Sequence, residues 1–144
     1  MTKAIDNSMM SERVNSNVLD NLAQHAHWLP RIALASVFLY HGLAKFAGLS
    51  AQATMMGLPV AVFALVALAE TAGGSLIVLG AFTKDIVTRL GGLLILPPML
   101  GAIMMVHWGR WAFTPADGYP MGGMEFQVTL VLVAVFFILR GNKA

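Results

Sequence analysis

The most constraining feature of this sequence is an apolar run from Leu58 to Phe82 that carries one carboxylate, Glu70, near its centre. A bilayer has a hydrocarbon core of ~30 Å, which needs roughly 20 helical residues, so this run is long enough to cross it. Glu70 then lies near the midplane, where a charged side chain costs at least ~2.5 kcal/mol on insertion scales. We therefore expect Glu70 to be paired, protonated or turned toward a wet cavity.

The composition supports a membrane protein and narrows its chemistry. The 144 residues are 58% hydrophobic and 11% charged, whereas soluble domains carry about 25% charged residues. The net charge of +2 is small, so we do not expect nucleic acid as a partner. The absence of cysteine excludes disulfides, thiol–disulfide exchange and thiolate metal sites, so any redox chemistry must use a borrowed cofactor. We interpret the ten methionines as flexible apolar filler.

The pattern predicts an all-α polytopic membrane protein, a bundle of four transmembrane helices. Pro97-Pro98 lies at the centre of the third span and predicts a kink or break that frees the carbonyls of Leu93 and Leu94. Such a break is tolerated only where the helix is buried in protein or lines a cavity. A small polar linker is expected over residues 47–57, and an aromatic boundary loop follows the third span. The expected spans are about residues 31–49, 58–82, 86–107 and 123–139.

The sequence divides into a polar N-terminal segment, residues 1–29, and a membrane domain, residues 30–144. Residues 1–17 show no periodicity and no secretory signal. Residues 18–29 predict a short amphipathic helix lying on the membrane surface, because apolar side chains recur there at helical spacing. These apolar positions are Val18, Leu19, Leu22, Ala26 and Leu29.

The basic residues predict the orientation. Four spans place both termini on one side, and only Lys45 and Arg110 fall on the other. The positive-inside rule therefore puts both termini in the cytoplasm. The expected location is the bacterial inner membrane. The basic residues on the terminus side are Lys3, Arg13, Arg31, Lys84, Arg89, Arg140 and Lys143.

This orientation gathers polar side chains from four helices in the outer half of the bundle. Opposite charges compensate one another only when they turn inward, so we expect the cluster to converge. The expected pairs join Glu70 to His41 or Lys45, and Glu125 to Arg110 or His107, although Arg110 could instead extend to lipid headgroups.

Each member also has a purely structural interpretation, which stays open. Glu70 could be a packing acid, and His41 a core histidine bonded to a carbonyl. Lys45 could be an interface anchor and His107 a boundary residue. Glu125 stands at a helix N-terminus, where the dipole favours an acid. No Glu-x-x-His spacing occurs, so no metal site is expected. Haem is not expected either, because both candidate axial histidines lie near the outer end.

Several polar and glycine-containing segments follow one another in order along the chain: Arg31, His41-Gly42-Leu43-Ala44-Lys45-Phe46, Glu70-Thr71-Ala72-Gly73-Gly74, Leu79-Gly80-Ala81-Phe82-Thr83, Met99 to Ala102 and Gly122-Gly123-Met124-Glu125. Together they resemble DoxX-type membrane proteins, over roughly residues 31–141. The long polar start and the Pro97-Pro98 pair lie outside the resemblance. The resemblance implies a four-helix membrane protein. Relatives of this type include subunits linked to quinone-coupled sulfur oxidation, in thiosulfate:quinone oxidoreductase, and proteins associated with oxidative-stress complexes.

Three functions remain open on this basis. The first is a quinone-binding or accessory membrane subunit of an oxidoreductase system, with Glu70 and His41 as a proton relay and with other protein subunits as partners. The second is a structural subunit of a larger membrane complex, and the third is a small proton or solute transporter, which would need a homo-oligomer. The candidate quinone pocket consists of His41, Lys45, Glu70, His107 and Glu125.

Overall fold

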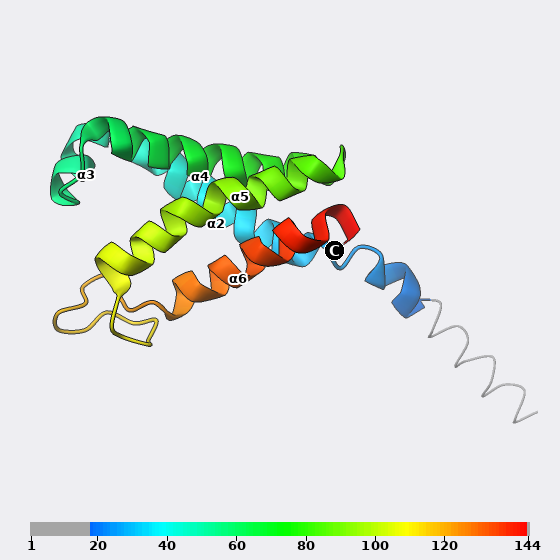
Figure 1. Ribbon diagram of the computed structural model, residues 1–144. Coiled ribbons are helices and arrows are strands. Elements are labelled where there is room, and N and C mark those ends of the chain that lie inside the picture. Colours follow the sequence, from blue (N-terminus) through cyan, green and yellow to red (C-terminus); the bar gives the residue numbers. More distant parts are fainter. Residues whose placement is uncertain (1–17, 144) are drawn as a thin grey trace, which may run out of the picture. The chain divides into compact units, whose positions relative to one another are not determined.

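The computed structural model of the protein describes residues 18–143 and is built from helices. The membrane bundle is formed by four long helices, with a short helix α3 at one end (Figure 1). The elements are α2 (Trp28–Phe46), α3 (Leu49–Met55), α4 (Val60–Gly80), α5 (Asp85–Ala102), the π-helical turn η1 (Ile103–His107), α6 (Glu125–Arg140) and the 3-10 turn η2 (Gly141–Lys143).

Within residues 18–143, three helical stretches are long and apolar enough to cross a membrane by themselves. They are Val60–Gly80, Asp85–His107 and Glu125–Lys143. A fourth crossing is obtained if the helix ending at Phe46 and α3 form one broken span, bent by 103°. The protein is thus an all-helical, multi-pass membrane protein, as the hydropathy pattern predicts.

The contacts within the chain divide it between Pro30 and Arg31. On the N-terminal side of this division, residues 18–23 are helical and residues 24–27 form a turn before α2 begins at Trp28. The amphipathic helix predicted over residues 18–29 is therefore interrupted by this turn at residues 24–27. Residues 1–17, whose sequence shows no periodicity, lie outside the described residues.

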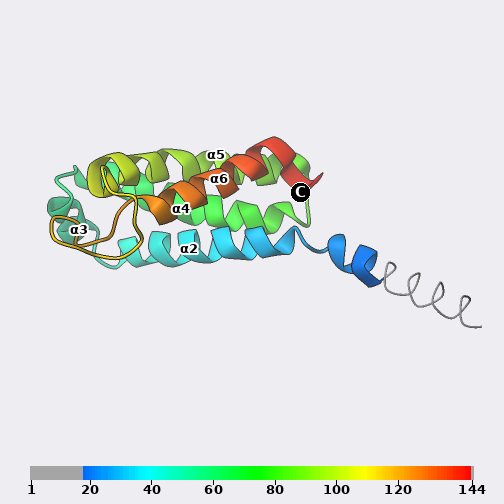
Figure 2. The same ribbon diagram turned by 90° about the horizontal axis from the view of Figure 1, so that it is seen from below.

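The helices of the bundle approach closely at small residues. A Cβ added at Gly91 of α5 would lie 3.0 Å from the carbonyl oxygen of Gly73 in α4, and one at Gly92 would lie 2.9 Å from that of Ala134 in α6. Gly74 of α4 likewise faces the backbone of α2. Because lipid provides no hydrophobic drive for helix association, such close backbone approach is a main source of packing energy. Figures 1 and 2 show α4 and α5 side by side, with α2 running along α4.

The core is apolar and the outer surface of the bundle is apolar as well. Leu34, Phe38, Ile77, Ile95 and Phe137 are almost fully buried where α2, α4, α5 and α6 meet. Each of these helices also exposes large apolar side chains on its outer face. An apolar exterior of this extent is expected of a surface that faces lipid.

Helix α5 contradicts the break predicted at its proline pair. It continues through Pro97 and Pro98 to Ala102, and the irregular turn comes later, at Ile103–His107. Each proline lacks a backbone donor, so the carbonyls one turn earlier lack their usual partners. Both prolines line a cavity, and backbone groups without a helical partner are tolerated at membrane depth where they line a cavity.

The polar linker predicted over residues 47–57 is also different in the structure. It contains the short helix α3, bounded by Gly48 and by Gly57, whose φ is +64°. Side chains within it satisfy local carbonyls: Thr54 donates to Ser50 O at 3.0 Å and Gln52 donates to Ala44 O at 3.4 Å. The small polar residues of this stretch therefore indicate a change in the direction of the chain, and the stretch still contains a helix.

At the opposite end of the bundle, a set of hydrogen bonds joins α2 to α4, to α5 and to η2, the turn that follows α6. Arg31 of α2 is 1% exposed. Its guanidinium donates to Ile77 O at 2.6 Å, to Thr88 Oγ1 at 3.0 Å and to Asn142 Oδ1 at 2.9 Å. It also lies 4.8 Å from the ring centroid of Phe137. We call Arg31, Thr88, Asn142 and Asp85 the Arg31 network.

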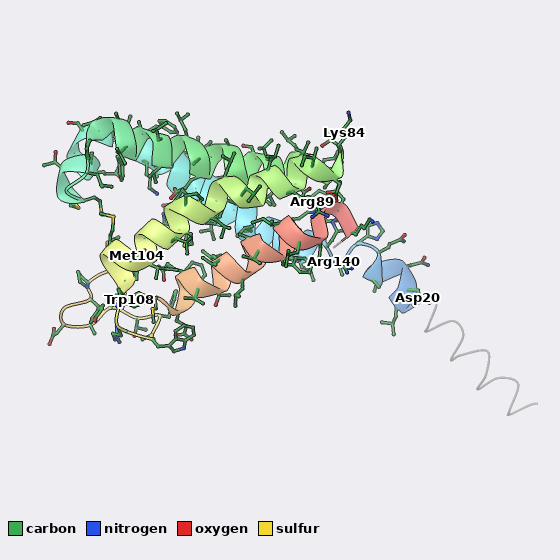
Figure 3. The ribbon with its side chains drawn as sticks, viewed as in Figure 1. Asp20, Lys84, Arg89, Met104, Trp108 and Arg140 are labelled. Carbon is green, nitrogen blue, oxygen red and sulfur yellow. The ribbon has the colours of Figure 1, made fainter. Side chains whose placement is uncertain are left out.

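Asn142 completes this network from η2. Its amide nitrogen Nδ2 donates to Gly80 O at 2.8 Å, and its backbone N–H donates to Asp85 Oδ1 at 2.7 Å. Asp85 in turn forms an ion pair with Arg89, with Nε and Oδ2 2.6 Å apart. The turn after α4, the start of α5 and the end of α6 are thus held to α2. Figure 3 shows Lys84, Arg89 and Arg140 at this end and Met104 and Trp108 at the other.

Candidate functional site

A cavity of about 630 Å³ lies in the half of the bundle away from the Arg31 network. We call it the Lys45 cavity. Its walls come from α2, α4, α5, η1 and α6, and most of them are apolar, including Phe38, Phe63, Leu130 and the Pro97-Pro98 pair. Some lining residues, such as Leu65 at 65% exposed, also reach the outer surface, so the cavity opens toward the region that lipid would occupy. Its volume is in the range of small-molecule sites, roughly 300–1,000 Å³.

Five polar side chains enter this apolar lining, and they come from four helical elements. His41 and Lys45 belong to α2, Glu70 to α4, His107 to η1 and Gln127 to α6. Sites for organic ligands have this character: an apolar pocket with a few polar groups that orient the ligand. The convergence predicted from the sequence is therefore present for four of the five residues assigned to the pocket.

Lys45 and Glu70 form the ion pair at the centre of the site. Nζ of Lys45 lies 2.6 Å from Oε2 of Glu70, and the two side chains are 19% and 8% exposed. Lys45 Nζ also lies 3.5 Å from the carbonyl oxygen of His41, which accepts the weaker bond. The close packing of α2 on α4 permits this pair, because Gly42 brings the α2 backbone against Thr71 and Glu70. Of the two partners predicted for Glu70, the structure selects Lys45.

His41 lines the cavity but does not hydrogen-bond to Glu70 within the described residues. Its side chain is exposed. Its ring stands edge-on to the ring of Tyr40, and the two ring centroids are 5.2 Å apart. His41 and Lys45 lie on one face of α2 because residues four apart are about one helical turn apart. His41 is therefore placed beside the ion pair, at the margin of the cavity.

His107 is buried and held in one orientation by two hydrogen bonds. Its Nδ1 lies 3.0 Å from the carbonyl oxygen of Gly122, and its Nε2 lies 3.0 Å from Nε2 of Gln127. The side chain is 6% exposed and comes from the π-helical turn that ends α5. π-Turns occur frequently at functional sites, where they redirect side chains.

Glu125 is not part of the cavity, and the ion pair predicted for it is wrong. It begins α6, and no ion pair joins it to Arg110 or His107 among residues 18–143. Arg110 instead donates to the carbonyl oxygen of Thr114 and lies 5.9 Å from the ring centroid of Tyr119, within its own loop. The helix period explains the outcome: two residues turn a helix by about 200°, so Gln127 faces the cavity and Glu125 faces away.

The sequence interpretation missed Gln127 because it searched for ionisable groups. A lone amide in the apolar stretch of α6 was the available signal, since a buried polar side chain needs a partner. Four methionines also line the cavity and were predicted only as filler. They are Met56, Met99, Met105 and Met121.

Comparison with known proteins places this geometry in a family. The model of the DoxX family matches residues 27–108, which is more than half of the chain. The chain belongs to the DoxX family. The match includes Lys45, Glu70 and His107, whereas Gln127 lies beyond it. The resemblance noted from individual motifs is thereby confirmed.

One curated DoxX-type relative carries a functional name. The chain is 30% identical over 118 residues to a Bacillus subtilis (strain 168) protein named "Putative oxidoreductase CatD", covering 80% of this chain and 78% of the relative. No solved structure matches the chain. The geometry of this DoxX protein therefore has to be interpreted from its own residues.

Proposed function

We propose that this DoxX protein is a membrane subunit of an oxidoreductase system and that the Lys45 cavity binds a quinone head group. The observation that carries the proposal is the cavity itself, an apolar volume at membrane depth with an ion pair in its wall. A quinone is an apolar ring with two carbonyl oxygens and a lipid-soluble tail. Such a ligand fits an apolar pocket that opens toward lipid and carries a few hydrogen-bonding groups.

The Lys45–Glu70 pair offers both hydrogen-bonding roles at one point. The ammonium has three N–H donors; one is directed to Glu70 and one toward the His41 carbonyl, which leaves one for a ligand oxygen. The Glu70 carboxylate accepts hydrogen bonds and can take up or release a proton. A quinone, when bound, accepts two electrons and two protons, and ionisable groups at membrane depth deliver such protons.

His41 supports the proton side of this proposal by its place at the exposed margin. A proton that reaches Glu70 must enter from outside the site, and His41 is an exposed residue of the cavity lining on the same face of α2 as Lys45. Histidine is suited to this step because its two ring nitrogens accept and release protons near neutral pH. The proposed relay therefore runs from His41 to Glu70.

The proposal includes an electron-carrying partner, since the sequence has no cysteine to act as a redox group. The relative's printed name, an oxidoreductase, supports a redox setting. We place the protein in the bacterial inner membrane with the Arg31 network toward the cytoplasm, because most basic residues lie at that end.

The proposal is tested by purifying the protein at its native level in mild detergent and quantifying quinones and proteins in the same sample by mass spectrometry. About one quinone per chain is expected, with strong depletion in Lys45→Met. Lys84→Met, at the opposite end of the bundle, is the matched control and should retain quinone.

Two other outcomes would contradict the proposal. A stable complex with other subunits but without quinone, even after incubation with a short-tailed quinone, would indicate a structural subunit. An isolated oligomer that carries solute flux in proteoliposomes would indicate a transporter.

A further inference from the structure

We propose that Gln127 makes the Lys45 cavity selective for the reduced, hydroxyl-bearing form of its ligand, a hydroquinone, over the oxidised form with two carbonyls. The inference rests on the proposed function and adds a specificity-determining residue to it. It starts from one atom: Oε1 of Gln127 is the one buried side-chain oxygen or nitrogen without a hydrogen-bond partner among residues 18–143.

The hydrogen bonds around His107 determine which end of the Gln127 amide is left over. The carbonyl oxygen of Gly122 can only accept, so His107 Nδ1, 3.0 Å away, carries a proton and donates it. In the neutral imidazole, Nε2 is then an acceptor. The group 3.0 Å from it must be the NH₂ of Gln127, so Oε1 is the end that remains unpartnered.

An unpartnered acceptor on a cavity wall favours a ligand that brings a donor. Gln127 lines the same cavity as Lys45 and Glu70. Oε1 itself is buried, so the proposed contact requires that the amide turns toward the cavity while its NH₂ keeps the bond to His107. A hydroquinone hydroxyl then donates to Oε1 and removes the penalty of a buried, unpaired carbonyl. A quinone carbonyl at the same place would set two acceptors against each other.

The Lys45–Glu70 pair of the same cavity does not discriminate in this way. It presents a donor and an acceptor together, so it can bind either a carbonyl or a hydroxyl oxygen. Selectivity between the two redox forms therefore arises at Gln127. The hydrogen bonds from Gly122 through His107 use the NH₂ of Gln127, so its Oε1 is left as an acceptor without a donor.

The test compares the affinities of the two redox forms of one probe, a decyl-tailed benzoquinone and its hydroquinone. The full chain is placed in lipid nanodiscs under argon, and empty nanodiscs provide the blank. The wild-type protein should bind the hydroquinone about three- to tenfold more tightly, which is the range of one neutral hydrogen bond. Gln127→Leu should reduce this ratio to about one, mainly by weakening the hydroquinone.

Three further variants separate recognition from folding. Gln127→Glu should keep the preference, because a carboxyl group bonded to His107 still leaves an acceptor oxygen for the ligand. His107→Phe should lose the preference, because the freed amide can present either end. Gln52→Leu, an amide on α3 outside the cavity, is the matched control and should leave the ratio unchanged.

The outcomes distinguish this inference from the proposed function. If neither redox form binds, the proposed function fails and the inference fails with it. If both forms bind with equal affinity, or if Gln127→Leu keeps the preference, the quinone site stands and the inference is overturned.

Discussion

The two ends of the bundle both place charged side chains among apolar helices, but they use them differently. At the Arg31 end, a guanidinium that is 1% exposed is surrounded by carbonyl, hydroxyl and amide acceptors from α4, α5 and η2. At the Lys45 end, an ion pair stands in the wall of a cavity of about 630 Å³. In the described part of the chain, the only buried side-chain nitrogen or oxygen without a hydrogen-bond partner is Oε1 of Gln127, at this second end.

This difference suggests how to distinguish structural from functional polarity inside a membrane protein. A network whose members satisfy one another gains nothing from a ligand, whereas a cavity with remaining hydrogen-bonding capacity does. Burial alone would have pointed to Arg31 as a site residue, because Arg31 is more deeply buried than Glu70 or His107. The capacity that remains after internal bonding is the better indicator, and the following variants test it.

The largest effect on folding is expected from Arg31→Met. The change removes the donors to Ile77 O, Thr88 and Asn142 and should lower the free energy of unfolding by about 3 kcal/mol or more. Unfolding in mixed detergent micelles measures this loss, and quinone bound per folded protein should stay unchanged. Arg140→Met is the control, since Arg140 is exposed and donates to Lys143 O at the same end. If the free energy of unfolding falls by less than about 1 kcal/mol, the Arg31 network does not have a structural role.

The next largest effect on stability is expected when two glycines of α5, one in each half of the bundle, are replaced by alanine. A Cβ at Gly92 meets the carbonyl oxygen of Ala134 and the side chain of Ile138, whereas a Cβ at Gly101 meets nothing within 4 Å. Gly92→Ala should therefore destabilise by about 1–3 kcal/mol, and Gly101→Ala should be neutral or stabilising by up to about 1 kcal/mol. Equal effects in thermal unfolding would contradict the contrast between a tight half and an open half.

Glu70→Gln is expected to lower stability less than these changes but to abolish quinone-dependent turnover. The change leaves the Lys45 ammonium without its carboxylate at 19% exposure and should cost about 1–2 kcal/mol. The double variant Lys45→Met/Glu70→Gln should recover most of this, because it leaves no unpaired charge at the site. Quinone-dependent turnover should be lost in both. Full turnover in Glu70→Gln would exclude Glu70 from the proton path.

The smallest effect is expected from Glu125→Gln. Glu125 is a first-turn acid of α6 outside the cavity lining, so only the favourable helix-dipole term is lost, about 0.3–1 kcal/mol. Quinone content should equal that of the wild type. Depletion of quinone in this variant would show that the site extends beyond the cavity and that Glu125 belongs to it, as the sequence suggested.

Hydropathy predicted the fold well because each span is long, and length with apolar composition is what a bilayer demands. The ends of the helices were predicted less well: α3 occupies a stretch that composition marked as linker, and α5 passes through two prolines. In both cases tertiary packing overrides the local signal, and a sequence pattern contains no information on that packing.

The site was predicted in part for the same reason. A partner for Glu70 could be predicted, because an acid at the midplane needs one, but the sequence left the choice between His41 and Lys45 open. Gln127 and the network role of Arg31 depend on which residues of distant segments meet. Arg31 and Asn142 are 111 residues apart, and no local pattern connects them.

That separation also has a consequence for biosynthesis. Ribosomes add roughly 5–20 residues per second, so α2 must wait about 6–22 s after Arg31 is made before Asn142 exists. During this interval the guanidinium has already reached the membrane boundary without one of its hydrogen-bond acceptors. The nascent chain is therefore expected to depend on the insertion machinery or on lipid phosphates to shelter Arg31 until synthesis has passed α6.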